Sequence, residues 1–199
     1  MPEPRVAELV RNTAETRIAV LIRLDGAGEA HAATGVGFFD HMLTHIAKHG
    51  LFDVTVEAEG DLHIDAHHTV EDVGITLGKA FREALGDMRG VRRFGHAVVP
   101  MDEALAEAAI DISGRPFLAF HADFAGKRVG GFDAELTEEF FRAFAMNARI
   151  TLHLDLRRGA NVHHSIEVLF KAFARALDDA SRRDGRSDAI PSTKGMLDV

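Results

Sequence analysis

The sequence predicts an α+β fold of two similar halves, each a β-sheet covered by helices on one face. Three observations predict it. A segment that starts with two adjacent histidines occurs twice, alternating apolar residues typical of strands precede each copy, and apolar residues at helical spacing follow it. We expect residues 1–90 and 91–199 to form the two halves of one compact unit, the second ending in a C-terminal loop.

The repeat is clearest around the histidine pairs. The first copy has the sequence His-His-Thr-Val-Glu at 67–71, and the second has His-His-Ser-Ile-Glu at 163–167. Three further pairs of segments are similar: 78–85 with 170–177, 50–56 with 148–154 and, less closely, 16–22 with 106–112. Two related halves are the simplest explanation, and elements found in one half are expected in the other.

The elements follow in order along the chain. Alternating apolar residues predict strands over 16–24 and 52–58, and helical spacing predicts helices over 38–48 and 136–146. After each histidine pair a helical stripe of apolar residues continues, to Leu85 before Gly86 in the first half and to Leu177 in the second. From about Ser181 the chain is polar and predicts a loop.

Composition excludes several classes of protein. The chain has no cysteine, so disulfides and thiolate metal sites are excluded. Its net charge of −8 argues against non-specific nucleic-acid binding, which depends on neutralising phosphates. No apolar run approaches the roughly 20 residues that span a bilayer, and the N-terminus does not resemble a secretory signal. We therefore expect a cytoplasmic protein that binds neither nucleic acid nor membrane.

Histidine is the informative residue, with 12 in 199. In each His-His-x-x-Glu motif, one helical turn brings a histidine and the glutamate to the same face, while the adjacent histidines point about 100° apart. One motif therefore suits two metals better than one. Histidine and carboxylate ligands suit Mn, Fe, Ni or Zn. The repeat pairs His41 with Glu139, so if one is a ligand, the other occupies the matching place.

A structural explanation competes with the metal site. A single His-His pair near a glutamate is more often a capped helix start, and His41 considered without the repeat is a surface histidine. The remaining histidines have no support from the repeat and are expected to face solvent or form structural hydrogen bonds: His31, His63, His96, His121 and His153. The second copy of the motif is what favours the metal.

Five motifs in order along nearly the whole chain resemble the imidazoleglycerol-phosphate dehydratase family. They are Phe-Asp-His-Met-Leu at 39–43, His-Gly-Leu-Phe-Asp at 49–53, Asp-Ala-His-His-Thr-Val-Glu-Asp at 65–72, Asn-Val-His-His-Ser-Ile-Glu at 161–167 with Phe-Lys-Ala-Phe at 170–173, and Pro-Ser-Thr-Lys-Gly at 191–195. The resemblance implies a hydro-lyase of histidine biosynthesis that converts imidazole glycerol phosphate to imidazole acetol phosphate and water.

The resemblance also implies a cofactor, an assembly and ligands. We expect two Mn ions per active site, with other divalent metals as alternatives, at subunit interfaces of a 24-subunit homo-oligomer. The implied ligands are His41, His67, His68, Glu71, His163, His164 and Glu167. The family commonly has histidine where this chain has Glu139. That departure puts one ligand in doubt, although a carboxylate is an acceptable replacement for Mn.

The resemblance assigns further roles. Metal bound to the substrate would act as Lewis acid and template, and Glu15 would be the general acid/base. By position alone, Glu15 would be a solvated residue before a strand. Expected substrate or phosphate contacts are His45, His49, Arg93, Arg115, Lys171, Ser192 and Lys194. His45 and His49 also fit a surface position, and each basic residue taken singly fits a solvated charge.

Two other functions remain open. In one, the histidine pairs hold subunits together through metal without turnover. In the other, the chain is a metal sensor or store that binds metal but no imidazole compound. The structural alternative leaves Glu15 and the basic C-terminal loop unexplained, and the sensor leaves the phosphate-binding residues without a purpose.

Overall fold

The computed structural model describes residues 4–197, and its first half forms one four-stranded sheet with two helices. The elements are β1 Val6–Asn12, β2 Thr16–Arg23, β3 Ala30–Ala33, α1 Gly37–Gly50, β4 Asp53–Gly60 and α2 His67–Leu85. The strand order is β1-β2-β4-β3, with β3 parallel to β4 and the other pairs antiparallel. Alternation produces this sheet's inner face, since Ile18, Val20 and Ile22 of β2 are all buried.

The second half repeats this arrangement. Its elements are β5 Phe94–Met101, β6 Ala104–Asp111, β7 Phe117–His121, the short hairpin β8 Arg128–Val129 and β9 Phe132–Asp133, α3 Leu136–Ala148, β10 Thr151–Arg158 and α4 Val162–Ser181. The sheet order β5-β6-β10-β7 matches the first sheet strand for strand. The predicted fold class, two similar halves with helices on one face of each sheet, is confirmed.

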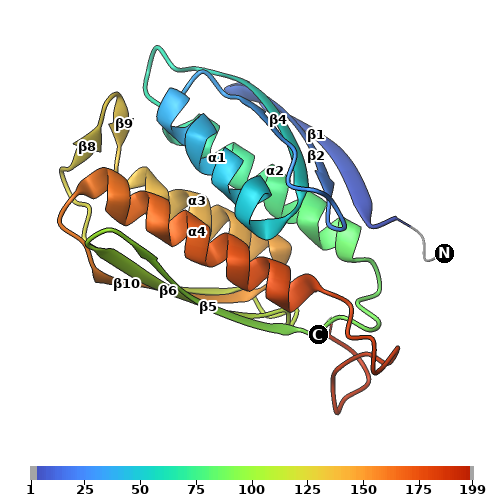
Figure 1. The fold of residues 1–199 in the computed structure, drawn as a ribbon. Coiled ribbons are helices and arrows are strands. Elements are labelled where there is room, and N and C mark those ends of the chain that lie inside the picture. The colour runs from blue at the N-terminus through green and yellow to red at the C-terminus, as the bar shows by residue number, and fades with distance from the viewer. Residues whose placement is uncertain (1–3, 198–199) are drawn as a thin grey trace.

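The four helices lie between the two sheets (Figure 1). Contacts between the halves are made by α2 with α3 and by α1 with α4. Two glycines let α2 approach α3 closely, because a Cβ on Gly74 would lie 2.8 Å from Ala143 Cβ and one on Gly78 would lie 2.6 Å from the Phe144 carbonyl oxygen. Apolar side chains fill the rest of this layer, including the fully buried Phe81.

All four helices begin at the same end of the molecule (Figure 1). Two of them start earlier than the apolar stripes alone indicate, with His67 as the first residue of α2 and His163 as the second residue of α4. The helix α4 ends at Ser181, where the sequence predicts the C-terminal loop to begin. Within residues 4–197, no helix is long and apolar enough to cross a membrane.

Strand register corrects one part of the repeat alignment. Val20 pairs with Val56 in the first sheet, and Ala108 pairs with Leu154 in the second. Since 50–56 corresponds to 148–154, Val20 corresponds to Ala108, two residues before the position that pairing 16–22 with 106–112 gives. That pairing was wrong by two residues, a shift that keeps the same face of the strand inward. The correct register puts Glu15 and Glu103 in equivalent turns.

Candidate active site

Side chains from α1 and α4 converge on one carboxylate, that of Glu167. His163 Nε2 lies 3.0 Å and His41 Nε2 3.3 Å from Glu167 Oε2. His45 Nε2 lies 3.2 Å from Oε1, and Lys171 Nζ lies 2.6 Å from the same oxygen. We call these five residues the Glu167 cluster. Donor atoms of His41, His45 and Glu167 all lie within 4.8 Å of one another, a spacing that a single metal ion could bridge.

Helical spacing within each helix explains why these residues meet. His163 and Glu167 are four residues apart on α4, and His41 and His45 are four apart on α1, so each pair shares one face. The contact between α1 and α4 brings the two faces together. The Asn161 side chain caps α4 by accepting hydrogen bonds from the backbone amides of His163 and His164, which fixes where the motif enters the helix.

The electrostatics keep the donors of this cluster available. Burial raises the pKa of Glu167, but the hydrogen bond from Lys171 and the charge at His45 outweigh it and lower that pKa to about 2. Burial lowers the pKa of His45 to about 4, and it lowers the pKa of His49 as well. At neutral pH the cluster therefore presents an ionised carboxylate beside a neutral imidazole, and these are the states in which both groups bind metals.

The first motif has a different environment. His68 Nδ1 lies 2.9 Å from Asp61 Oδ2 and 3.9 Å from Glu15 Oε2. The hydrogen bond to Asp61 raises the pKa of His68. His67 is exposed, and its ring is perpendicular to that of His68 at 90°. Adjacent histidines thus face different directions, as the helical geometry predicts.

The second histidine of the second motif has its own carboxylate, which the sequence did not single out. His164 Nδ1 lies 2.8 Å from Glu103 Oε2. Glu103 comes from the turn between β5 and β6, and its other oxygen accepts the Asn161 backbone N–H at 2.9 Å. The hydrogen bond from His164 lowers the pKa of Glu103 to about 2. Glu103 could have been identified from the sequence by its equivalence to Glu15 in the other half.

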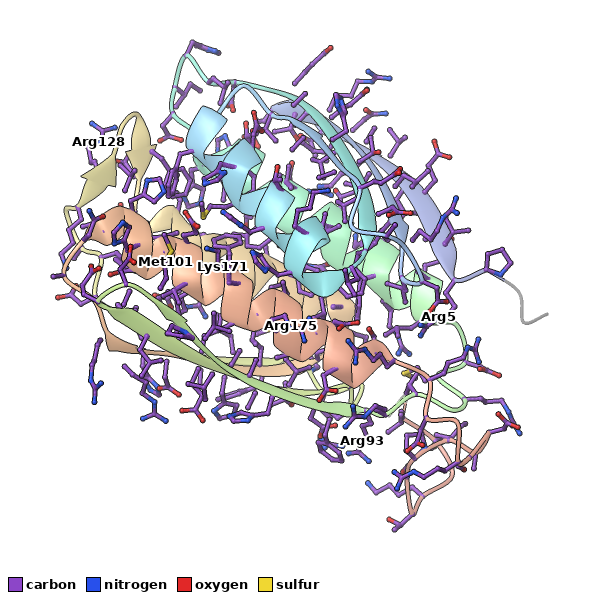
Figure 2. The ribbon with its side chains drawn as sticks, in the orientation of Figure 1. Arg5, Arg93, Met101, Arg128, Lys171 and Arg175 are labelled. Carbon is purple, nitrogen blue, oxygen red and sulfur yellow. The ribbon has the colours of Figure 1, made fainter. Side chains whose placement is uncertain are left out.

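The basic residues separate into two places. Arg93 binds Asp111 through Nε at 2.7 Å and donates to the Pro191 carbonyl at 2.9 Å. Arg115 Nη2 lies 3.6 Å from the same Asp111, so two predicted phosphate residues and Pro191 of the C-terminal loop lie together. Lys171 belongs instead to the Glu167 cluster. Figure 2 shows Arg93 near the C-terminal end of α4, well away from Lys171.

The rest of the predicted set is less tightly organised. In the C-terminal loop, Ser192 Oγ accepts the Lys194 backbone N–H at 3.2 Å. His49 stacks on His45 with ring centroids 5.4 Å apart. Glu71 and Glu139 are half-buried near the starts of α2 and α3. Among residues 4–197, no other group of three histidine or carboxylate side chains meets the spacing of His41, His45 and Glu167.

The five histidines without support from the repeat form hydrogen bonds on the surface or face solvent. His96 lies 3.0 Å from Glu107, and His121 lies 2.6 Å from Asp155, both on the surface. The other three are exposed: His31, His63 and His153.

Comparison with known sequences gives a consistent result. A family model described as imidazoleglycerol-phosphate dehydratase matches residues 34–177. The chain is 63% identical over 193 residues to the imidazoleglycerol-phosphate dehydratase of Symbiobacterium thermophilum, covering 97% of this chain and 93% of the relative. It is 58% identical over 198 residues to that of a Janthinobacterium species, covering 99% of this chain and all of the relative.

Comparison with solved structures extends the similarity to the fold. A crystal structure of imidazoleglycerol-phosphate dehydratase from Staphylococcus aureus superposes with a TM-score of 0.79 at 44% identity, covering 88% of this chain and 97% of that one. The structure of IGPD from Pyrococcus furiosus in complex with (S)-C348 gives a TM-score of 0.82 at 36% identity, covering 95% and 100%.

Proposed function

Since this chain belongs to the imidazoleglycerol-phosphate dehydratase family, we propose that it converts imidazole glycerol phosphate to imidazole acetol phosphate and water in histidine biosynthesis. The observation that carries the proposal for this chain is the Glu167 cluster. Two histidines from α1 and one from α4 surround an ionised carboxylate within hydrogen-bonding distance. Such a set has a chemical purpose beyond holding two helices together, because apolar residues would do that at less cost.

A divalent metal fits the donors of this chain. The Glu167 cluster offers imidazole nitrogens and a carboxylate, the donor types that Mn and related ions accept. We propose that His41, His163 and Glu167 hold one metal in the assembled protein, with His67, His68, Glu71, Glu139 and His164 as the remaining ligands of a two-Mn site. Bound there, the metal would supply Lewis-acid polarisation and a template for the substrate imidazole.

Glu15 suits the role of general acid/base. Its side chain is half-exposed, and its carboxylate lies 3.9 Å from His68 Nδ1, too long for a hydrogen bond. Its backbone N–H donates a 3.1 Å hydrogen bond to Thr13 Oγ1, and within residues 4–197 its carboxylate accepts no hydrogen bond. A carboxylate beside a metal-binding histidine, with its own oxygens free, can take the carbon-bound proton of the substrate and return a proton to the departing hydroxyl.

Two of the predicted phosphate residues, Arg93 and Arg115, lie at the opposite end of α4 from His163. Arg93 donates its backbone N–H to Ala180 near the end of α4, whereas His163 stands at the beginning of that helix. A helix of this length extends roughly 30 Å. A substrate with three carbons between imidazole and phosphate cannot reach from one end to the other. We therefore propose that Arg93 and Arg115 of one copy serve the metal site of another in a homo-oligomer, for which the family resemblance suggests 24 subunits.

The decisive experiment is turnover of imidazole glycerol phosphate by the purified oligomer, measured as isolated, after chelation and after Mn is restored. The expected result is activity that disappears on chelation and returns with Mn. Activity that persists after metal is removed would contradict the role of Mn. A folded, Mn-loaded oligomer without turnover would contradict the dehydratase proposal.

Melting temperature separates the enzyme from the two other functions. A triazole phosphonate resembles the substrate's ring and phosphate, and a ligand that binds the folded state raises the melting temperature. The enzyme predicts stabilisation by this compound only when Mn is present. A metal store or a metal-held scaffold predicts stabilisation by Mn alone, with no further effect of the phosphonate.

A further inference from the structure

The second histidine of each motif is held by a carboxylate through the same ring atom. Asp61 contacts His68 Nδ1 at 2.9 Å, and Glu103 contacts His164 Nδ1 at 2.8 Å. A carboxylate only accepts hydrogen bonds, so each contact keeps a proton on Nδ1. The free ring atom in both cases is Nε2, and its lone pair can then face a metal.

We propose that Glu103 and Asp61 are positioning residues, which fix the tautomer and ring orientation of His164 and His68 so that Nε2 of each is the metal-binding atom. The inference rests on the proposed function in that it takes both histidines as ligands. Carboxylates in this outer position usually affect metal affinity strongly, about 10- to 100-fold when they are removed. Neither residue is expected to touch the substrate.

In the two halves the carboxylate that contacts the histidine comes from different segments. The pairing of β10 with β6 shifts by one residue between Leu156 and Arg158, so Gly159 takes the place of Gly60. The place of Asp61 is then taken by Ala160, whose methyl group cannot accept a hydrogen bond. Glu103 supplies the carboxylate there from the turn that corresponds to the turn of Glu15. The same contact has therefore been kept at both histidines while its source differs, which indicates that the contact itself is required.

The two carboxylates are held in place in different ways. Glu103 Oε1 accepts the Asn161 backbone N–H at 2.9 Å and the Ala160 N–H at 3.4 Å, which leaves Oε2 facing His164. Asp61, at the start of the loop before α2, is held by burial instead: its side chain is 11% exposed, and within residues 4–197 its Oδ1 has no hydrogen-bond partner. Asp61 thus belongs to the segment that leads into α2, and Glu103, in the turn between β5 and β6, is hydrogen-bonded to the segment that leads into α4. A small displacement of either carboxylate would turn its histidine.

A glutamine at position 103 separates positioning from helix capping. In Glu103→Gln, the amide oxygen still accepts the Asn161 and Ala160 N–H groups, but the amide nitrogen now faces Nδ1 and donates to it. His164 must then carry its proton on Nε2, the atom required for the metal. Glu103→Ala removes both the contact to His164 and the acceptor for the two backbone groups.

The test measures Mn affinity of the purified oligomers by electron paramagnetic resonance of free Mn, together with the melting temperature of the metal-free proteins. We expect Glu103→Gln to weaken Mn binding about 10- to 100-fold while its metal-free melting temperature stays near that of the wild type. Glu103→Ala should lower both. Glu107→Gln is the matched control, because Glu107 also contacts a histidine, His96, but on the surface away from the motifs. It should leave Mn affinity unchanged.

Two further arms make the test specific. Asp61→Asn should reproduce the loss of Mn affinity at the other histidine. In a His164→Ala background, Glu103→Gln should have no additional effect on Mn binding, because Glu103 acts through that ring. Wild-type Mn affinity in Glu103→Gln, or an undiminished effect in the His164→Ala background, would overturn the inference.

Failure of the inference and failure of the proposed function have different signatures. Wild-type protein that turns over substrate, with Glu103→Gln binding Mn normally, overturns the positioning role alone. Wild-type protein that binds Mn without turnover overturns the dehydratase proposal alone, and weaker Mn binding by Glu103→Gln would still support the positioning role.

Discussion

Glu15 and Glu103 occupy equivalent turns of the two halves, but only Glu103 forms a hydrogen bond with the histidine it faces. The distance is 2.8 Å from Glu103 Oε2 to His164 and 3.9 Å from Glu15 Oε2 to His68. In the first half Asp61 accepts the hydrogen bond from that histidine instead, so His68 Nδ1 is not available to Glu15. Under the two proposals above, this pair of glutamates has separate tasks: the carboxylate of Glu103 holds a ring, and that of Glu15 moves a proton.

Replacing Glu15 with glutamine should reduce turnover while leaving the metal in place. A general acid/base contributes about 10²- to 10⁴-fold to rate, and the amide cannot take a proton. We expect kcat to fall by a factor in that range and Mn content per chain to stay at the wild-type value, measured on the same preparation. Glu8→Gln, an exposed glutamate on β1, is the control and should keep full activity. Loss of Mn together with activity would instead make Glu15 a residue of the metal site.

The proposed role of Glu139 as a metal ligand can be tested by replacing its carboxylate with other side chains. Glu139→Ala should weaken Mn binding at least tenfold, whereas Glu139→His should retain it, because Mn accepts either oxygen or imidazole nitrogen. Equilibrium dialysis followed by metal analysis measures both variants. The neighbouring Glu138 pairs with Arg142, so Glu138→Ala tests for a general effect of removing charge from this helix. Equal Mn affinity in Glu139→Ala and wild type would remove Glu139 from the ligand set.

The close contact between α2 and α3 predicts sensitivity to a single methyl group. Alanine favours helix over glycine by up to about 1 kcal/mol, but a Cβ at Gly74 would lie 2.8 Å from Ala143 Cβ. Overpacking costs about 1–3 kcal/mol, so Gly74→Ala should lower stability despite its better helix propensity. Urea unfolding at one fixed protein concentration measures this. Gly37→Ala, whose Cβ would meet nothing within 4 Å, should show no such loss.

Arg5, directly before β1, connects the start of this strand to the end of α4, and its replacement should lower the stability of the fold. It donates to the Ser181 carbonyl at 2.5 Å and, through Nε, to Asp25 at 2.8 Å, and only 7% of its side chain is exposed. Hydrogen bonds of charged groups contribute about 1.5–3 kcal/mol each, so Arg5→Leu should lower the free energy of unfolding by about 2 kcal/mol. Arg23→Leu, which affects an exposed pair 3.9 Å apart, should change it by less than about 0.5 kcal/mol.

The same pair predicts a pH dependence. The hydrogen bond from Arg5 lowers the pKa of Asp25 below its ordinary value of 3.8. Its contribution to stability is therefore complete above pH 3.8 and is lost as pH falls through the lower pKa of the folded state. The stability difference between wild type and Arg5→Leu should be constant near neutral pH and shrink below pH 3.8. A difference that grows on acidification would contradict this assignment.

Much of the fold could be predicted because the apolar periodicities are strong. The alternation of Ile18, Val20 and Ile22 and the helical stripes after each histidine pair gave the correct element types. The exact correspondence of the first strands could not be predicted, because a shift of two residues keeps every side chain on the same face. Only hydrogen-bond register, here Val20 with Val56 and Ala108 with Leu154, distinguishes the two alignments.

That shift also explains why Glu103 could not be identified from the sequence alignment of the two halves. The alignment from sequence pairs Glu15 with Leu105, which hides its equivalence to Glu103. Spacing within one helix did predict the contact of His163 with Glu167, because it depends only on local geometry. The separation of Arg93 from Lys171 depends on where α4 places its two ends, and motif order along the chain carries no information about it.

The shared direction of the four helices has an electrical consequence. Each helix start carries a partial positive charge equivalent to roughly half a proton, because its first backbone N–H groups lack acceptors within the helix. Four such starts at one end oppose the net charge of −8 carried by the chain as a whole. A field of that sign disfavours protonated imidazole and favours ionised carboxylate. The backbone itself therefore favours negatively charged groups near these helix starts.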